Sequence, residues 1–63
     1  MDTNIPIDLN LPEDEAYAMA ELCKRLSWRD ARDLSVDDRE ARTMLRACDH
    51  VRIALAKAGF SVR

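Results

Sequence analysis

The 63-residue chain is poor in the residues that form turns, cross-links and catalytic sites, because it has one Gly, two Pro, two Cys and one His. A single glycine excludes a Gly-rich phosphate-binding loop. The chain also lacks a run of about 20 apolar residues, which a membrane-spanning helix requires. Its first residues lack the basic start and the apolar core of a signal peptide, so we expect a cytoplasmic protein.

The two cysteines are expected to be reduced core residues. Both lie on the apolar sides of expected helices, where a free cysteine behaves as a small hydrophobic side chain, and disulfides are rare in the cytoplasm. A Cys23–Cys48 disulfide and a zinc site are the alternatives. Zinc usually takes four Cys or His ligands, whereas the chain offers only Cys23, Cys48 and His50. We therefore expect no metal and no cofactor.

Residues 36–58 carry the strongest helix pattern and contain neither Gly nor Pro. At about 100° per residue, one face collects the apolar side chains, namely Ala41, Met44, Leu45, Cys48, Val51, Leu55 and Ala58. Ser35 is expected to be the N-cap, with Asp38 completing a capping box. Gly59 is expected to be the left-handed C-cap residue, followed by Phe60 as an apolar clasp. These features predict a long amphipathic helix.

Residues 12–26 are expected to form a second amphipathic helix that begins at Pro12, a natural first-turn residue. One face collects its apolar residues, namely Ala16, Met19, Leu22, Cys23 and Leu26. A short helix over residues 28–33, capped by Ser27, joins the two. The predicted fold class is mainly α: a single domain, residues 1–63, in which two long helices pack antiparallel.

The core of such a short chain is too small to give more than marginal stability to a monomer. A domain of this size buries only about 60% of its unfolded surface. Trp28, the one Trp, is expected to pack between the two long helices, with a role as a binding anchor as the alternative. Because the core remains small, we expect a homodimer.

Residues 1–11 are expected to form an extended arm. Ile5, Ile7, Leu9 and Leu11 alternate with polar residues or Pro, which is the period of a half-buried strand. A strand needs a ladder partner, which is either residues 60–63 or the same strand of another copy. The alternative is an arm that lays its apolar side chains on the helices.

Two charged surfaces are candidate binding sites for a protein partner. The first 34 residues hold eight acidic and four basic side chains, whereas the remaining residues hold four and six. The acidic face, on residues 12–26, consists of Glu13, Asp14, Tyr17 and Glu21. The basic row, on the outer side of residues 36–58, consists of Arg39, Arg42, Arg46, His50, Ile53 and Lys57. The alternative for the basic row is a solvated charged face without a partner. The alternative for the acidic cluster at residues 13–15 is that its carboxylates only stabilise the N-terminus of the helix.

Neither enzymatic activity nor nucleic-acid binding is favoured by these residues. Cys48, Asp49 and His50 are neighbours in sequence, but adjacent residues of a helix point about 100° apart, so they cannot form a nucleophile pair. The pI of 5.2 lies below the value of about 9 that is typical of nucleic-acid-binding domains. We therefore expect a non-enzymatic binding protein, with DNA binding by the basic row as the alternative.

Four stretches of the sequence resemble a known family of small proteins. They are residues 11–20 (LPEDEAYAMA), 24–32 (KRLSWRDAR), 40–41 (EA) and 51–60 (VRIALAKAGF). The chain resembles a family of small uncharacterised helical proteins of proteobacteria and their mobile elements. The shared positions are helix caps and core residues, so the resemblance implies a fold and no chemistry.

Small acidic helical proteins of bacterial phages and mobile elements are similar in type to anti-CRISPR proteins, which act without an active site by occupying a surface. This resemblance implies an inhibitor of a host defence complex of the CRISPR-Cas type. In that hypothesis, the carboxylates of the acidic face mimic nucleic-acid phosphates, and Tyr17 is an anchor.

Overall fold

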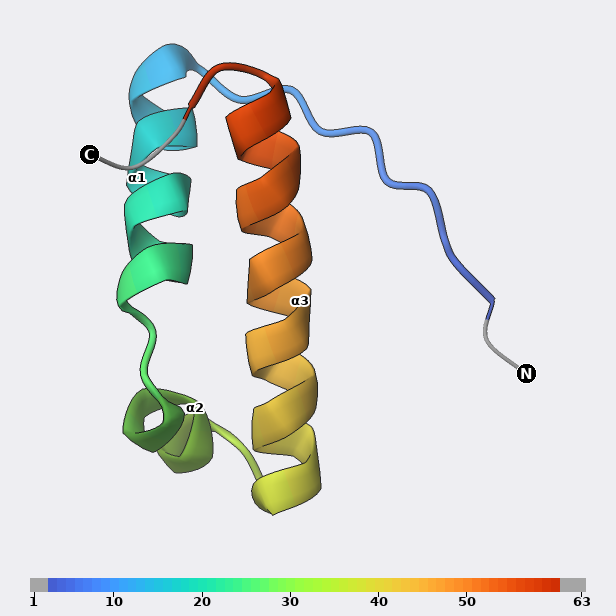
Figure 1. Cartoon of the computed structure of the whole chain (residues 1–63), viewed down its shortest axis with the longest axis vertical. Coiled ribbons are helices and arrows are strands. Elements are labelled where there is room, and N and C mark those ends of the chain that lie inside the picture. The colour runs from blue at the N-terminus through green and yellow to red at the C-terminus, as the bar shows by residue number, and fades with distance from the viewer. Residues whose placement is uncertain (1–2, 61–63) are drawn as a thin grey trace.

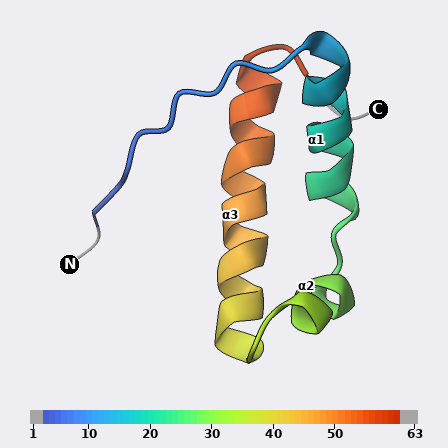
Figure 2. The same cartoon turned by 180° about the vertical axis from the view of Figure 1, so that it is seen from behind.

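The computed structural model describes residues 3–60 and contains three helices there (Figure 1). They are α1 (Glu13–Arg25), α2 (Trp28–Leu34) and α3 (Asp38–Lys57). Helices α1 and α3 lie side by side and antiparallel, and α2 joins them at one end (Figure 1 and Figure 2). Both α1 and α2 pack against α3. The mainly α fold with two long antiparallel helices is therefore confirmed.

The start of α3 differs from the prediction. Asp37, rather than Ser35, is the N-cap, and its Oδ1 accepts the N–H of Glu40 at 2.8 Å. The Glu40 carboxylate in turn accepts the N–H of Val36 at 3.0 Å. Ser35 instead ends α2, where its N–H donates to the Arg32 carbonyl at 3.3 Å. Ser35 and Asp37 are both good caps, and the chain needs residues 35–37 to turn from one helix into the next.

The end of α3 is the predicted C-cap. Gly59 has a φ of 97°, and its N–H donates to the Ala56 carbonyl at 3.0 Å. The N–H of Phe60 donates to the Leu55 carbonyl at 2.8 Å. These two bonds form a Schellman motif, which satisfies the last carbonyls of the helix.

Both shorter helices begin close to the predicted positions. The α2 helix has the full capping box: the Ser27 hydroxyl accepts the Asp30 N–H, and the Asp30 carboxylate accepts the Ser27 N–H at 3.1 Å. The Ser27 hydroxyl also donates to the Asp30 carboxylate at 2.9 Å. The two hydrogen bonds that Ser27 donates to this carboxylate, the backbone one foremost, lower the pKa of the Asp30 carboxyl. The α1 helix begins at Glu13, one residue after the predicted start, with Pro12 at the N-cap position. The Pro12 carbonyl still accepts the Ala16 N–H at 2.9 Å.

The buried residues of the described chain are all small, namely Ala16, Ala20, Cys23, Ala31 and Ala41. The larger apolar residues Met44, Leu45 and Leu55 of α3 are only half-buried. Leu22, Val51 and Ala58 were expected to face inward and are exposed. Trp28, which was expected to pack between the long helices, begins α2 and is 42% exposed, so it is only partly buried.

The arm, residues 3–12, is neither helix nor strand. It crosses the C-terminal end of α3 and then runs outward from the helices (Figure 1 and Figure 2). Ile5, Ile7 and Leu9 are 77%, 80% and 65% exposed, so these three side chains are not buried on the helices of their own chain, whereas Leu11 is half-buried. Of the expected pairing partners, residues 61–63 lie outside the described residues, and pairing with a second copy stays a prediction.

Candidate functional site

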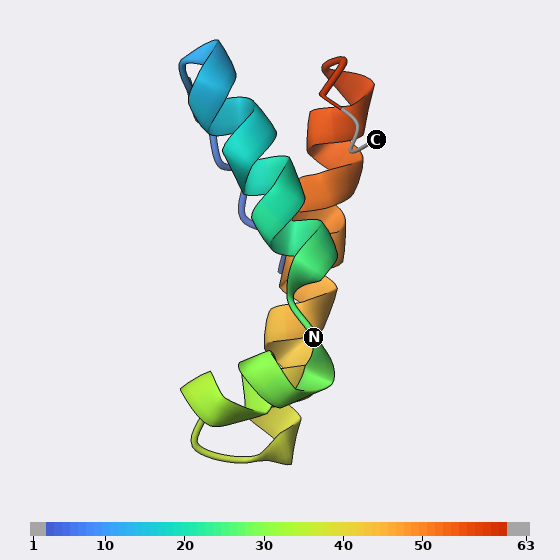
Figure 3. The same cartoon turned by 90° about the vertical axis from the view of Figure 1, so that its left-hand side faces the viewer.

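An apolar groove lies between α1 and α3, at the end where α1 begins and α3 ends. The two helices diverge toward this end (Figure 3). The groove has a volume of about 450 Å³, and the arm, both helices and the C-terminal turn line it. Among residues 3–60, Asn10 is its one polar lining residue. The apolar lining includes Ile7, Leu9, Met19, Val51, Leu55 and Phe60.

The groove exists because the apolar arc of α3 is wider than the surface that α1 and α2 cover. At 100° per residue, Val51 and Ala58 lie about 60° and 80° to one side of Cys48. Cys48 is half-buried, whereas Val51 and Ala58 are exposed. The sequence pattern assigned all three residues to one core face and so missed the groove. The width of the apolar arc was the signal that could have revealed it.

The residues of the acidic face differ in whether they contact other side chains of the chain. Glu21 forms an ion pair with Arg25 at 3.0 Å, and the Tyr17 ring packs against Phe60. Both side chains therefore already have a partner within the chain, while Tyr17 remains 41% exposed. Glu13 and Asp14 are exposed in the first turn of α1 and form no ion pair with any residue in the described range. Only these two residues remain as open carboxylates of the predicted face.

The basic row lies where the helical periodicity predicts, on the side of α3 away from α1. All of its side chains are exposed, and Ile53 is 50% exposed among them. Arg46 donates to the Thr43 hydroxyl at 3.4 Å, while Arg39 and Arg42 have no ion-pair partner within residues 3–60. The row is therefore an accessible cationic surface with one aliphatic side chain.

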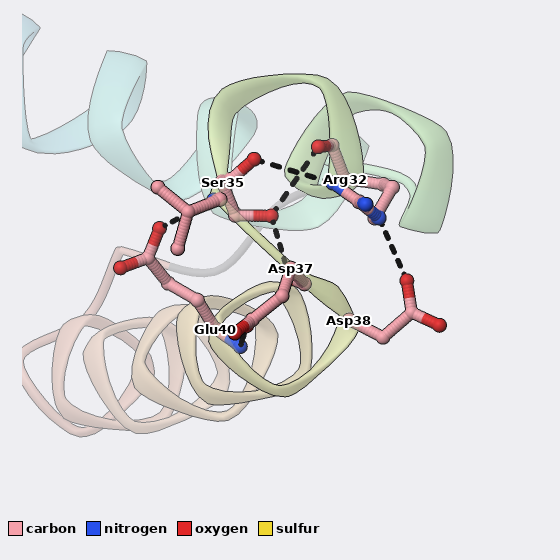
Figure 4. Close-up of polar contacts among 6 residues, drawn as sticks. Arg32, Ser35, Asp37, Asp38 and Glu40 are labelled. Carbon is pink, nitrogen blue, oxygen red and sulfur yellow. Dashed lines mark hydrogen bonds and ion pairs between the residues drawn. The ribbon is translucent and has the colours of Figure 1, made fainter.

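A compact set of polar contacts fixes α2 to α3 (Figure 4). Arg32 forms an ion pair with Asp38 at 2.7 Å, and it also donates to the Ser35 carbonyl at 3.2 Å. The Ser35 hydroxyl donates to the Asp37 carbonyl at 3.1 Å. Because these groups satisfy one another, the junction is a structural element that orients α2 and leaves few polar groups for a ligand.

The two thiols are free, with Cys23 buried and Cys48 half-buried. Burial raises the pKa of the Cys23 thiol, and the neighbouring Cys48 raises it further by charge repulsion and by a side-chain hydrogen bond. Within the described part of the chain, no group of three or more His, Cys, Asp and Glu side chains is arranged to hold a metal ion. None of the helices there is both long and apolar enough to cross a membrane.

One family model matches the chain over residues 1–63. The chain belongs to DUF7706. DUF7706 is described as a family of unknown function, so the match assigns no role to the groove, the acidic face or the basic row. No curated protein and no solved structure matches the chain significantly.

Proposed function

We propose that this chain is a non-enzymatic protein-binding module whose main contact surface is the apolar groove. One observation carries the proposal: large apolar side chains lie on the surface, while the buried residues in the described part of the chain are alanines and one cysteine. Exposed apolar surface that is contiguous marks protein interaction sites. The lining of the groove has almost no polar group, so it suits an apolar protein surface better than a substrate that needs acid–base chemistry.

Site-specific photo-crosslinking in the native cell tests this function. A photoreactive benzophenone side chain replaces Val51 in the groove, Asp14 on the acidic face or Arg42 in the basic row, each in a separate variant. We expect protein adducts from the Val51 position, because the groove faces the partner. If none of the three positions yields a protein adduct, the protein-binding function is wrong.

Another form of the protein-binding function, which uses the acidic face instead of the groove, is inhibition of a host defence complex of the CRISPR-Cas type. Its support is the pair of open carboxylates, Glu13 and Asp14, at the exposed start of α1. The test is co-expression with an active interference system that targets a plasmid. The wild-type chain should protect the plasmid, and the double variant Glu13→Lys, Asp14→Lys should not.

The matched control for that test is Asp33→Lys, which changes an exposed carboxylate on α2 and should leave the protection intact. A plasmid that is destroyed equally with and without the wild-type chain would contradict the inhibitor function. Equal protection by the wild type and the double variant would contradict the assigned surface.

The second candidate function is DNA binding by the basic row. The observation that favours it is the exposure of Arg39 and Arg42 without ion-pair partners in the described chain. If the row contacts phosphates, affinity falls with salt, and Arg42→Ala with Arg46→Ala reduces the salt slope by about two. Arg25→Ala is the control, because Arg25 is paired with Glu21 on α1. Absence of binding to any duplex at low salt rules this function out.

A further inference from the structure

The helices of residues 3–60 form a single layer in one copy of the chain. Helices α1 and α2 each pack against α3 and, within residues 3–60, they make no packing contact with each other. Figure 3 shows α1 and α3 edge-on, meeting near α2 and diverging at the other end. A domain normally buries its apolar faces between two packed layers. Residues 3–60 of a single chain provide no such second layer.

The solvent-accessible area of the chain also indicates that part of its surface is covered by another protein. The chain exposes 5525 Å², whereas a compact monomer of 7.2 kDa exposes about 4,100 Å². The excess is about 1,400 Å², which exceeds the roughly 800 Å² per partner that a standard interface buries. The excess is therefore large enough to supply one protein interface of ordinary size.

The groove is suited to meeting a copy of itself. Two-fold symmetric dimers bring the same patch of both chains together, so a charged patch would face its own charge. The described lining of the groove contains no charged side chain. Depletion of charge is the feature that distinguishes the core of an interface from the rest of a protein surface.

The arm has apolar side chains that can contact the groove of a second copy. Ile7 and Leu9 border the groove of their own chain, yet they remain 80% and 65% exposed. Residues 3–10 make no backbone hydrogen bond that ties them to the helices. Their apolar side chains are therefore available to the groove of a neighbouring chain.

We propose that the groove binds a second copy of this chain, with the two arms exchanged so that Ile7 and Leu9 of each copy pack beside Val51 of the other. This inference rests on the proposed protein-binding function and identifies the partner of the same groove. The exchanged arms and the two groove faces together form the missing second layer.

Light scattering on the full chain, with four proteins in parallel, tests the proposal. The wild type should have twice the mass of the 7.2 kDa chain. Val51→Asp in the groove and Ile7→Asp in the arm should each reduce it to the mass of one chain. Ile53→Asp is the matched control: it places the same charge on α3, at a side chain that is 50% exposed and lies outside the groove, and it should remain a dimer.

The exchange of arms has its own test, in which the Ile7→Asp and Val51→Asp proteins are mixed. The mixed dimer contains one intact arm on one intact groove, so mixing should restore dimers that neither protein forms alone. Because the arm lies outside the helices, Ile7→Asp should leave the circular dichroism spectrum unchanged, and loss of its dimer is then not a loss of folding.

Three results would overturn the proposal. A monomeric wild type rules out the second copy, and dimers that persist in both variants rule out this surface. A mixture that stays monomeric rules out the exchange of arms. A monomeric wild type that still gives adducts with another protein from the Val51 position would reject the second copy and keep the protein-binding function.

Discussion

The ring of Tyr17 meets the ring of Phe60 edge to face, with centroids 4.8 Å apart and an interplanar angle of 74°. Tyr17 belongs to α1, and Phe60 follows the C-cap of α3. This pair therefore holds the two helix ends together at the open end of the molecule, beside the groove that Phe60 lines.

A double-mutant cycle should show this coupling. Edge-to-face pairs contribute about 0.5–1.5 kcal/mol beyond the area they bury, so Tyr17→Leu and Phe60→Leu should be non-additive by that amount. The measurement is urea unfolding at one fixed chain concentration, since dimerisation makes stability concentration-dependent. Tyr17→Leu with Trp28→Leu is the control cycle, because Trp28 begins the distant α2. Equal coupling in both cycles would show that the ring contact adds no stability.

Gly59→Ala should destabilise the fold through the backbone alone. The φ of 97° at Gly59 is a conformation that residues with a Cβ rarely adopt, and the cost is about 1–2 kcal/mol. A Cβ built there meets no atom within 4 Å, so no steric clash adds to it. Gly59→Asn should cost less, because Asn visits this region more readily. The midpoints of thermal unfolding of the wild type, Gly59→Ala and Gly59→Asn test this order of stability. Identical midpoints would contradict the role of Gly59 as the C-cap residue.

Asp37→Ala should remove the N-cap of α3 and cost about 1 kcal/mol. Ser35→Ala should cost less, since the one hydroxyl hydrogen of Ser35 is shared between the Arg32 and Asp37 carbonyls and the hydroxyl caps no N–H of α3. Helical content and thermal midpoint, measured by circular dichroism, compare the two variants. If Ser35→Ala loses more helical content and thermal stability than Asp37→Ala, Ser35 and not Asp37 is the N-cap of α3.

The features that the sequence predicts correctly are local ones. The Gly59 C-cap and the Ser27 capping box depend on hydrogen bonds between residues that are three to five positions apart. The exposed basic row follows from periodicity alone. Each of these needs only the chain within one helix, so residue type and spacing are sufficient to predict it.

The features that the sequence misses depend on what covers each surface. Val51 has the residue type and the spacing of a core position, and it is exposed because α1 covers only one side of the apolar arc of α3. Tyr17 was placed on an open acidic face, but Phe60, 43 positions along the chain, packs against its ring. The path of the arm is equally non-local, since its alternating pattern fits any apolar surface in reach. Such outcomes follow from tertiary packing, which spacing within one helix does not report.

Ala41→Leu should be strongly destabilising for a chain of this size. Ala41 is 0% exposed, as is Ala31 in the helix α2 that packs on the same helix. Extra methylene groups in such a site force the helices apart, at a cost of about 1–3 kcal/mol. Ala56→Leu is the matched control on α3, because Ala56 is exposed, and it should stay within about 0.5 kcal/mol of wild type. Urea unfolding that shows equal effects for both would mean that Ala41 is not a packing position.

The Cys23 thiol should resist alkylation in the folded chain. Burial raises its pKa above the ordinary value of 9.0, and Cys48 adds to this; Asp49 raises the pKa as well, while Arg52 lowers it. Only the thiolate reacts, so at pH 8 folded Cys23 should be alkylated at least about tenfold more slowly than in the urea-unfolded chain. Mass spectrometry of peptides taken over time measures the rate.

The Cys48→Ala variant separates the effect of burial on the pKa of Cys23 from the effect of the neighbouring thiol. Cys48→Ala abolishes the charge repulsion and the hydrogen bond but leaves Cys23 buried, so the rate at Cys23 should rise without reaching that of the unfolded chain. Because the folded-state pKa is raised, the folded chain holds this proton more tightly than the unfolded chain. Its contribution to stability is therefore complete below pH 9.0 and is lost as the pH rises through the folded-state value. Equal alkylation rates in the folded and unfolded chains would contradict the buried position of Cys23 between α1 and α3.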